Sequence, residues 1–292
     1  MRVALRLALA ALLVVPVAGW AAGYRLAPWK DDLFAWPGVI ESKDNGAYVV
    51  VDYKELRDIN ERDEIPERRA LPQYVELAFQ KEGTWQAGTG TLKYFGFGKA
   101  EGGARAVVIY VHGMGGDRYQ GANQWMFGGN FNRIMNLMFR NDGAYLSPDF
   151  SDFGEKGKNE IKALVKSQAQ VSPGAAIFVA CGSQGGAICW QLATDAEAAK
   201  LLSGILLLGS NHDDAFLKGP AFRARVPLYL GHGSHDVVFG WEDEAAFYRK
   251  VKAAAPTYPI RFALFDTGTH GTPIRMTDWR TVLNWMLEVQ GK

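Results

Sequence analysis

The 292-residue chain has little cysteine and no excess of charge of either sign. Its two cysteines, Cys181 and Cys189, are too few for a disulfide framework or for a structural zinc site, which needs about four ligands in a recognisable spacing. The 32 basic and 31 acidic residues leave a formal charge of +1. Nucleic-acid surfaces need clustered positive charge, so this balance argues against a nucleic-acid partner.

What the chain does have is apolar and aromatic content, at 48% and 12% of its residues. A disordered chain is poorer in aromatic and β-branched residues, so this composition predicts a folded protein. The length allows about two domains, but α/β folds often reach roughly 250 residues as one domain. No internal repeat or low-complexity tract is visible.

The N-terminus carries two arginines, Arg2 and Arg6, followed by an uncharged run from Leu7 to Tyr24. Basic residues before an apolar stretch are typical of a secretory signal peptide, and Gly19 and Ala21 offer small residues for cleavage. The run is also long enough to remain as a membrane anchor. A buried soluble helix is less favoured, because the run lacks a polar face. We therefore expect export, with the folded part periplasmic or secreted, or held outside the cytoplasm by the anchor.

Short apolar or alternating runs predict strands along most of the chain. These runs are Gly46–Tyr53, Gln73–Phe79, Gly90–Phe97, Arg105–Val111, Ala144–Ser147, Ala175–Ala180, Gly204–Gly209, Val226–Gly231 and Ile260–Phe265. Helical spacing of apolar residues lies between the later runs, around Phe131–Met138, Ile161–Val165, Glu242–Ala255 and Trp279–Met286. Alternating strands and helices predict an α/β fold with a mostly parallel central sheet and helices on both faces.

This pattern divides the chain into three parts. Residues 1–24 are the signal peptide or anchor, residues 25–71 form an N-terminal extension of undefined role, and residues 72–292 form one α/β domain. In such a sheet, ligands bind beyond the carboxyl ends of the strands. The loops that follow the apolar runs are therefore the places to search for chemistry, and they are His112–Gly116, Cys181–Gly186, His232–Asp236 and Thr267–Gly271.

The loop Cys181–Gly186 has the pattern of a nucleophile elbow, a tight strand–turn–helix that exposes a serine. Such a turn needs small residues two positions before and after Ser183. Gly185 satisfies this need, whereas Cys181 stands where glycine is commonest. A glycine-rich β–α turn with an incidental serine remains the alternative for this motif taken alone.

Taken together, the loops resemble the α/β-hydrolase superfamily over about residues 72–290. The family places its nucleophile, acid and histidine after successive strands, and Ser183, Asp236 and His270 occur in that order. Its oxyanion loop matches His112-Gly113-Met114-Gly115, without a third consecutive glycine. The resemblance implies that Ser183 is the nucleophile, His270 its base and Asp236 the partner of the histidine. It also implies an oxyanion hole formed by the backbone amides of Gln184 and of Gly113 or Met114.

Several residues admit other readings. Asp213 or Asp214, after another strand, offers an alternative acid, and His232 with His235 is conceivable as a metal pair. No third ligand accompanies those histidines at metal spacing, so we expect no metal. We expect His232 to pack beside its strand end, His112 to orient the oxyanion loop, and Cys181 to be a buried and inert thiol.

The substrate side is less defined. Trp125, Met126 and Phe127 follow the oxyanion loop and either line an acyl or aryl pocket or serve in packing. The basic residues Arg118, Arg133 and Arg275 either bind an acid group or are solvated at the surface. Only 16 residues separate Gly209 from Val226, where this family often inserts a lid, so we expect no large cap domain.

The sequence therefore predicts a serine hydrolase that cleaves a carboxylic ester through an acyl-enzyme, needs no cofactor and acts on a small-molecule ester or acyl substrate. A peptidase or thioesterase would use the same residues, and a noncatalytic binding protein of the same fold is a further alternative. Membrane association is expected only through residues 7–24, and the oligomeric state is not indicated.

Overall fold

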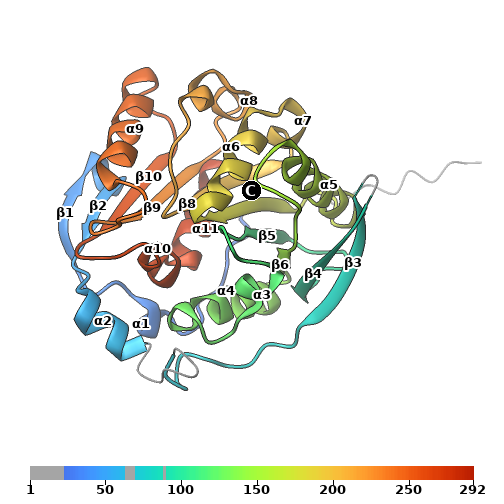
Figure 1. Ribbon diagram of the computed structural model, residues 1–292, viewed down its shortest axis with the longest axis horizontal. Helices are drawn as coiled ribbons and strands as arrows, with labels where there is room; N and C mark the ends of the chain where they lie inside the picture. The colour runs from blue at the N-terminus through green and yellow to red at the C-terminus, as the bar shows by residue number, and fades with distance from the viewer. Residues whose placement is uncertain (1–22, 63–69, 88–89) are drawn as a thin grey trace, which may run out of the picture.

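The structure, a computed structural model, describes residues 23–62, 70–87 and 90–292 (Figure 1). Its described strands form one sheet with the order β1-β2-β10-β9-β8-β7-β5-β6-β4-β3. The strands are β1 Val39–Lys43, β2 Tyr48–Val51, β3 Lys81–Ala87, β4 Gly90–Gly98, β5 Ala106–Val111, β6 Ala144–Pro148, β7 Ala176–Gly182, β8 Leu202–Leu208, β9 Leu228–Gly233 and β10 Ile260–Phe265. The seven strands from β2 to β6 in this order pair in parallel, so their carboxyl ends meet at one edge.

Helices cover both faces of the sheet. The helices are α1 Asp31–Phe34, α2 Glu55–Arg62, α3 Arg118–Ala122, α4 Asn130–Arg140, α5 Glu155–Val171, α6 Gly186–Thr194, α7 Ala196–Ala199, α8 Pro220–Arg223, α9 Trp241–Ala254, α10 Thr272–Met276 and α11 Trp279–Val289. Side chains of α5, α6 and α9 share one buried cluster with alternate residues of the central strands, and those of α4 and α11 share the other.

The strand β5 shows how the sequence produces these two layers. All six of its residues are buried, and Val107 and Ile109 point to one cluster while Val108 and Tyr110 point to the other. A strand that is apolar on both faces suits only the middle of a covered sheet. The expected α/β architecture, mostly parallel and without a large cap, is therefore confirmed. Between β8 and β9 the described chain forms only the short 3₁₀ turn η4 (Asp214–Lys218) and α8.

The N-terminal extension belongs to this sheet. The strand β2 pairs in parallel with β10, with Val51 opposite Phe265, and β1 adds to its other side. Val51 and Tyr53 are fully buried against the same core as α4 and α11. The segment 25–71 therefore contributes two strands to the same sheet as the residues that follow it. Sequence indicated the strand at Gly46–Tyr53 but not its pairing with a strand more than 200 residues away.

The segment Gln73–Phe79, expected as a strand, is not one, and the strand begins later, at Lys81. Side chains, rather than a neighbouring strand, bond its backbone. Gln124 bonds both the amide and the carbonyl of Ala78, and Asn132 does the same for Glu76. The alternating pattern therefore reflects an extended segment tied to other side chains.

The apolar N-terminal run lies almost wholly outside the described residues. From Gly23 onward, the ranges that the structure describes contain no helix with the length and apolarity needed to cross a bilayer. Tyr24, the last residue of the run, is part of the folded protein, since its buried hydroxyl donates to the carbonyl of Asn141 at 2.6 Å.

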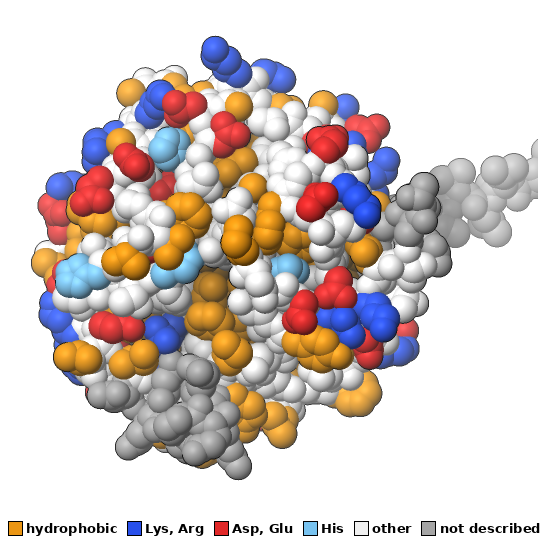
Figure 2. Space-filling model, in the orientation of Figure 1, with side chains coloured by type: hydrophobic (Ala, Val, Ile, Leu, Met, Phe, Trp, Pro, Cys, Tyr) orange, Lys and Arg blue, Asp and Glu red, His pale blue; other side chains and the backbone are white. Residues whose placement is uncertain are grey.

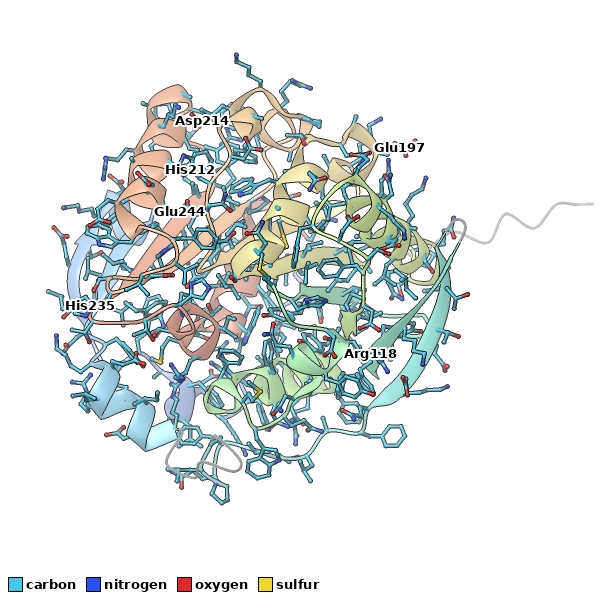
Figure 3. All side chains as sticks on the ribbon, in the orientation of Figure 1. Arg118, Glu197, His212, Asp214, His235 and Glu244 are labelled. Carbon is cyan, nitrogen blue, oxygen red and sulfur yellow. A yellow bond between two sulfur atoms is a disulfide. The ribbon has the colours of Figure 1, made fainter. Side chains whose placement is uncertain are left out.

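A buried acid in α9 gives the fold a pH dependence. Glu244 is 2% exposed on the inner face of the helix, where neither carboxyl oxygen has a hydrogen-bond partner among the residues that the structure describes (Figure 3). Burial, reinforced by the negative charge of Asp243, raises the pKa of Glu244 well above its ordinary value. The folded protein thus keeps a proton on Glu244 that the unfolded chain loses above about pH 4.3.

We predict that Glu244→Gln stabilises the protein at pH 8 and not at pH 4. Above the unfolded pKa, the unfolded chain binds fewer protons than the folded one, so the stability of the wild type falls as pH rises. The glutamine amide does not titrate, so the variant does not lose this stability as the pH rises. Thermal unfolding at both pH values should show the variant melting at least ~2–4 °C higher at pH 8, the shift expected for about 1 kcal/mol. Glu242→Gln, an exposed change on the same helix turn, is the matched control and should show no such difference.

Candidate active site

The candidate nucleophile lies at the end of the central strand β7. Ser183 has φ 51°, the left-handed conformation that side-chain-bearing residues seldom adopt, and it begins the short 3₁₀ turn η3 (Ser183–Gly185) that leads into α6. A methyl group at Gly185 would lie 2.6 Å from the carbonyl oxygen of His112, and one at Gly186 would lie 1.7 Å from the hydroxyl of Ser210. The glycines therefore allow a turn in which strand and helix approach closely, with the serine held at its apex.

Three loops bring a serine, a histidine and an aspartate into one hydrogen-bonded chain. The hydroxyl oxygen of Ser183 is 2.8 Å from Nε2 of His270, and Nδ1 of the same ring is 2.8 Å from Oδ2 of Asp236. The three residues follow β7, β10 and β9, whose carboxyl ends lie at the same edge of the sheet. The residues that sequence placed at three separate strand ends are thus linked through His270.

The aspartate is held in its ionised form. The Asp236 side chain is fully buried, and burial alone would raise its pKa. Hydrogen bonds from His232 and His270, together with those from the amides of Val238 and Phe239 at 2.8 and 3.1 Å, outweigh burial and hold the pKa of Asp236 well below its usual range. A carboxylate that stays charged can orient the histidine and stabilise it when it takes a proton.

His232 has a more direct place in the site than sequence indicated. Its Nε2 donates to the carbonyl of Phe239 at 2.8 Å and lies 3.3 Å from Oδ2 of Asp236. The ring is buried and lies close to the same carboxylate oxygen that His270 contacts, so it helps to hold the loop that carries Asp236. Its position four residues before the aspartate, at the end of the same strand, is the only sequence signal for this role.

The loop after β5 lies against the serine. A methyl group at Gly113 would be 2.8 Å from Cβ of Ser183, so only glycine fits there. His112 supports the loop through Nδ1, 2.9 Å from the carbonyl of Gly113, and its ring stacks on Phe150 with centroids 4.2 Å apart. Burial lowers the pKa of His112, which favours its neutral form. The backbone of Gly113 thus lies against the serine, and Met114 and Gln184 are the next residues in the chain after Gly113 and Ser183.

Comparison with known proteins gives matches at the level of structure alone. No family model matches the sequence, and no curated protein is detectably similar to it. Among solved structures, an esterase from Pyrococcus furiosus aligns with TM-score 0.53 at 16% identity, over 74% of this chain and 92% of that one. A serine hydrolase without a lid from Xanthomonas campestris aligns with TM-score 0.52 at 11% identity, over 74% and 97%. A thermostable esterase aligns with TM-score 0.57 at 15% identity, over 72% and 62%.

The chain has the α/β-hydrolase fold. Structural alignments at such low identity show the fold alone, so the activity has to be argued from the site. In this α/β-hydrolase fold, the candidate residues stand where ligands bind in open α/β sheets, beyond the carboxyl ends of the strands.

The alternative acids have other partners. The side chain of Asp213 accepts the amide of Ala215 and caps η4, and Asp214 forms an ion pair with Lys250 (Figure 3). Neither is hydrogen-bonded to His270, whose Nδ1 partner is Asp236. The part of the chain that the structure describes contains no group of three His, Cys, Asp or Glu side chains able to hold a metal.

Two of the basic candidates for binding an acid group are neutralised by carboxylates. Arg118 bonds Asp149 and Glu82, at 2.8 and 2.7 Å. Arg133 lies 3.1 and 3.2 Å from Asp31 and Asp278. The third, Arg275, is buried in α10, and its carbonyl accepts a hydrogen bond from Arg62.

Of the three residues suggested for the substrate pocket, Phe127 lies next to the triad. Gly271 directly follows His270 in the chain, and a methyl group on Gly271 would lie 3.1 Å from the ring of Phe127. Trp125 and Met126 are half-buried and form the preceding turn, in which their amides donate to the side chain of Asn123. Hydrophobic and histidine side chains also lie together near the middle of the face in Figure 2, with charged side chains mainly toward its rim.

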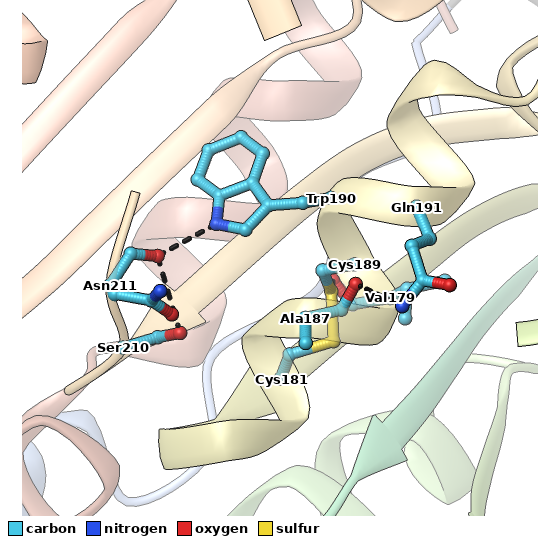
Figure 4. Close-up of a disulfide and its surroundings, with 8 residues drawn as sticks. All are labelled: Val179, Cys181, Ala187, Cys189, Trp190, Gln191, Ser210 and Asn211. Carbon is cyan, nitrogen blue, oxygen red and sulfur yellow. Dashed lines mark hydrogen bonds between the residues drawn. A yellow bond between two sulfur atoms is a disulfide. The ribbon is translucent and has the colours of Figure 1, made fainter. Parts of the chain in front are cut away.

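The expectation that Cys181 is a free, buried thiol is wrong. Cys181 and Cys189 form a disulfide with S–S 2.03 Å (Figure 4), so neither is a free thiol and Cys181 is no nucleophile. The bond joins the end of β7 to α6 and encloses Ser183. A separation of eight residues gives no obvious signal, but the tight strand–turn–helix brings the two Cα atoms to 6.2 Å.

We predict that the disulfide stabilises the protein and is present in the purified chain. Replacing both cysteines by alanine should lower the free energy of unfolding by about 2.5 kcal/mol, the chain-entropy value for a loop of this size. Denaturant unfolding of the oxidised protein and of the double variant measures this difference. Alkylation of both cysteines in denatured protein that has not been reduced would show that the bond does not form.

Proposed function

We propose that the protein is a serine hydrolase that cleaves carboxylic esters through an acyl-enzyme. The observation that carries the proposal is the continuous hydrogen-bonded chain from Ser183 through His270 to the ionised Asp236. A serine hydroxyl is a weak nucleophile until a base within hydrogen-bond reach takes its proton. The distance of 2.8 Å between Ser183 and Nε2 of His270 meets that requirement, and the equal distance from Nδ1 to Asp236 orients the ring.

In the first half of the reaction, the hydroxyl oxygen of Ser183 attacks the ester carbonyl and its proton passes to Nε2 of His270. Asp236 accepts the Nδ1–H throughout and stabilises the imidazolium. In this proposal, the negative oxygen of the tetrahedral intermediate receives hydrogen bonds from the amide of Gln184 and from that of Gly113 or Met114, each worth roughly 3 kcal/mol of barrier. Collapse of the intermediate breaks the ester bond, and the departing alkoxide takes the proton from Nε2.

In the second half, His270 takes a proton from water, and the hydroxide adds to the acyl carbonyl. The serine oxygen leaves and recovers its proton from the same nitrogen, which frees the carboxylic acid product. Phe127 beside Gly271, and Phe239 with its ring 5.8 Å from that of His270, favour an apolar acyl or aryl group next to the triad. The short connection between β8 and β9 supports small, soluble esters as substrates.

We predict that Ser183→Ala and His270→Ala each lower kcat for p-nitrophenyl butyrate by roughly 10⁴- to 10⁶-fold, and that the double variant loses little more. Asp236→Asn should cost about 10⁴-fold or less, since it disturbs the histidine tautomer and leaves the base in place. Asp213→Asn, which alters only the cap of η4, is the matched control and should retain wild-type kcat. Undiminished activity in Ser183→Ala would refute the proposal, and faster cleavage of matched p-nitroanilides than of the esters would favour a peptidase.

We also propose that the protein is exported. The arginines and apolar run at the N-terminus support this, as does the disulfide, because such bonds persist mainly in oxidising compartments. After expression of the full chain in a bacterial host, we expect the protein outside the cytoplasm or in the membrane fraction. Soluble cytoplasmic protein that still begins at Met1 would contradict export.

A further inference from the structure

We infer that Glu55, in the N-terminal extension, is a positioning residue that holds the loop carrying His270 in its catalytic geometry. The inference rests on the proposed function, because it concerns the same histidine. Its basis is a set of hydrogen bonds that joins α2 to the residues on either side of His270.

The carboxylate of Glu55 bridges two threonines. Thr269, directly before the histidine, donates its hydroxyl to Oε1 at 3.2 Å. Thr272, two residues after it, donates its hydroxyl to Oε2 at 3.0 Å. The same Thr272 hydroxyl accepts the amide of Thr269 at 2.9 Å, which closes a small network around His270. One side chain therefore fixes both ends of the segment that presents the imidazole.

The backbone around Glu55 holds the start of the same loop. Its amide donates to the hydroxyl of Thr267 at 3.0 Å, and that hydroxyl donates to the carbonyl of Tyr53 at 3.3 Å. Thr267 has φ 57°, a left-handed conformation that persists only where surrounding contacts hold it. The neighbouring Lys54 forms an ion pair with Asp266, the first residue after β10. Each residue from Tyr53 to Glu55 therefore contacts the histidine loop.

The sheet topology explains why these segments meet. Since β2 and β10 are parallel neighbours and end together at Val51 and Phe265, the chain leaves both strands at the same place. On its other side, the loop is held by the turn that carries the catalytic acid. There, Ser234 accepts the amide of Thr267 at 2.8 Å, and the carbonyl of Gly268 accepts the amide of His235. The histidine loop is thus fixed between the acid turn and the N-terminal extension.

This arrangement predicts a loss of rate more than a loss of folding. Glu55 is half-buried and Thr269 is exposed, so their bonds contribute little to overall stability, whereas a small misplacement of a catalytic group can cost up to about 10²-fold in rate. Glu55→Ala should lower kcat by about 10- to 100-fold, with KM for p-nitrophenyl butyrate and the melting temperature nearly unchanged.

Three further variants separate positioning from a general structural effect. Glu55→Gln keeps the length of the side chain and can bond both threonines, because its oxygen accepts from one hydroxyl and its NH₂ donates to the other. It should recover most of the lost kcat. Glu61→Ala makes the same change at an exposed position of the same helix and should behave as the wild type. Thr269→Val removes one of the two bonds at an exposed site and should reduce kcat even if Glu55→Ala proves unable to fold.

The test measures kcat, KM, melting temperature and hydrogen–deuterium exchange of the segment 266–276 for the wild type and these variants. Wild-type kcat in Glu55→Ala, or in Thr269→Val if the first variant does not fold, would overturn the inference. So would equal losses of kcat in Glu55→Ala and Glu61→Ala. If the wild type itself neither hydrolyses esters nor reacts at Ser183 with a fluorophosphonate, the proposed function fails. The exchange data then still report whether Glu55 holds the loop.

Discussion

The hydrogen bond between Asp236 and Nδ1 of His270 is the contact on which the rest of the site depends. It leaves Nε2 facing the hydroxyl of Ser183, and it requires a carboxylate that stays ionised although its side chain is fully buried. The protein meets that requirement with hydrogen bonds from His232, from His270 itself and from two amides of the same turn, which together more than offset the effect of burial on the pKa of Asp236. Without this support a buried carboxyl would take up a proton and lose its hold on the histidine.

The geometry of the sheet brings these groups together and also limits what can surround them. Seven parallel strands end at one edge, so loops that are distant in sequence become neighbours there. Close approaches at Gly113 and Gly185 then fit the loop after β5 against the turn that carries Ser183, and the Cys181–Cys189 bond links the two ends of that turn. The N-terminal extension is part of the same construction, since β2 continues the sheet past β10 and delivers Glu55 to the histidine loop.

Sequence could predict whatever depends on local pattern. The buried strands, and the loops after them, follow from apolar runs that end in glycine-rich turns, and the resemblance of those loops to the α/β-hydrolase superfamily singled out Ser183, Asp236 and His270. The disulfide, the contact of His232 with the acid and the bridge made by Glu55 depend on how separate segments pack, and the residues alone carry little trace of them. The segment Gln73–Phe79 has a strand-like pattern but forms no strand. Its backbone instead bonds the side chains of Gln124 and Asn132.

The most direct test of the account is to react the purified protein with a fluorophosphonate and to locate the adduct by peptide mass spectrometry. Only a serine activated by its neighbours reacts rapidly with such a probe. We expect one adduct per chain, on Ser183, formed much more slowly when Asp236 is replaced by asparagine. No adduct, or an adduct on another residue that forms equally fast in Ser183→Ala, would contradict it.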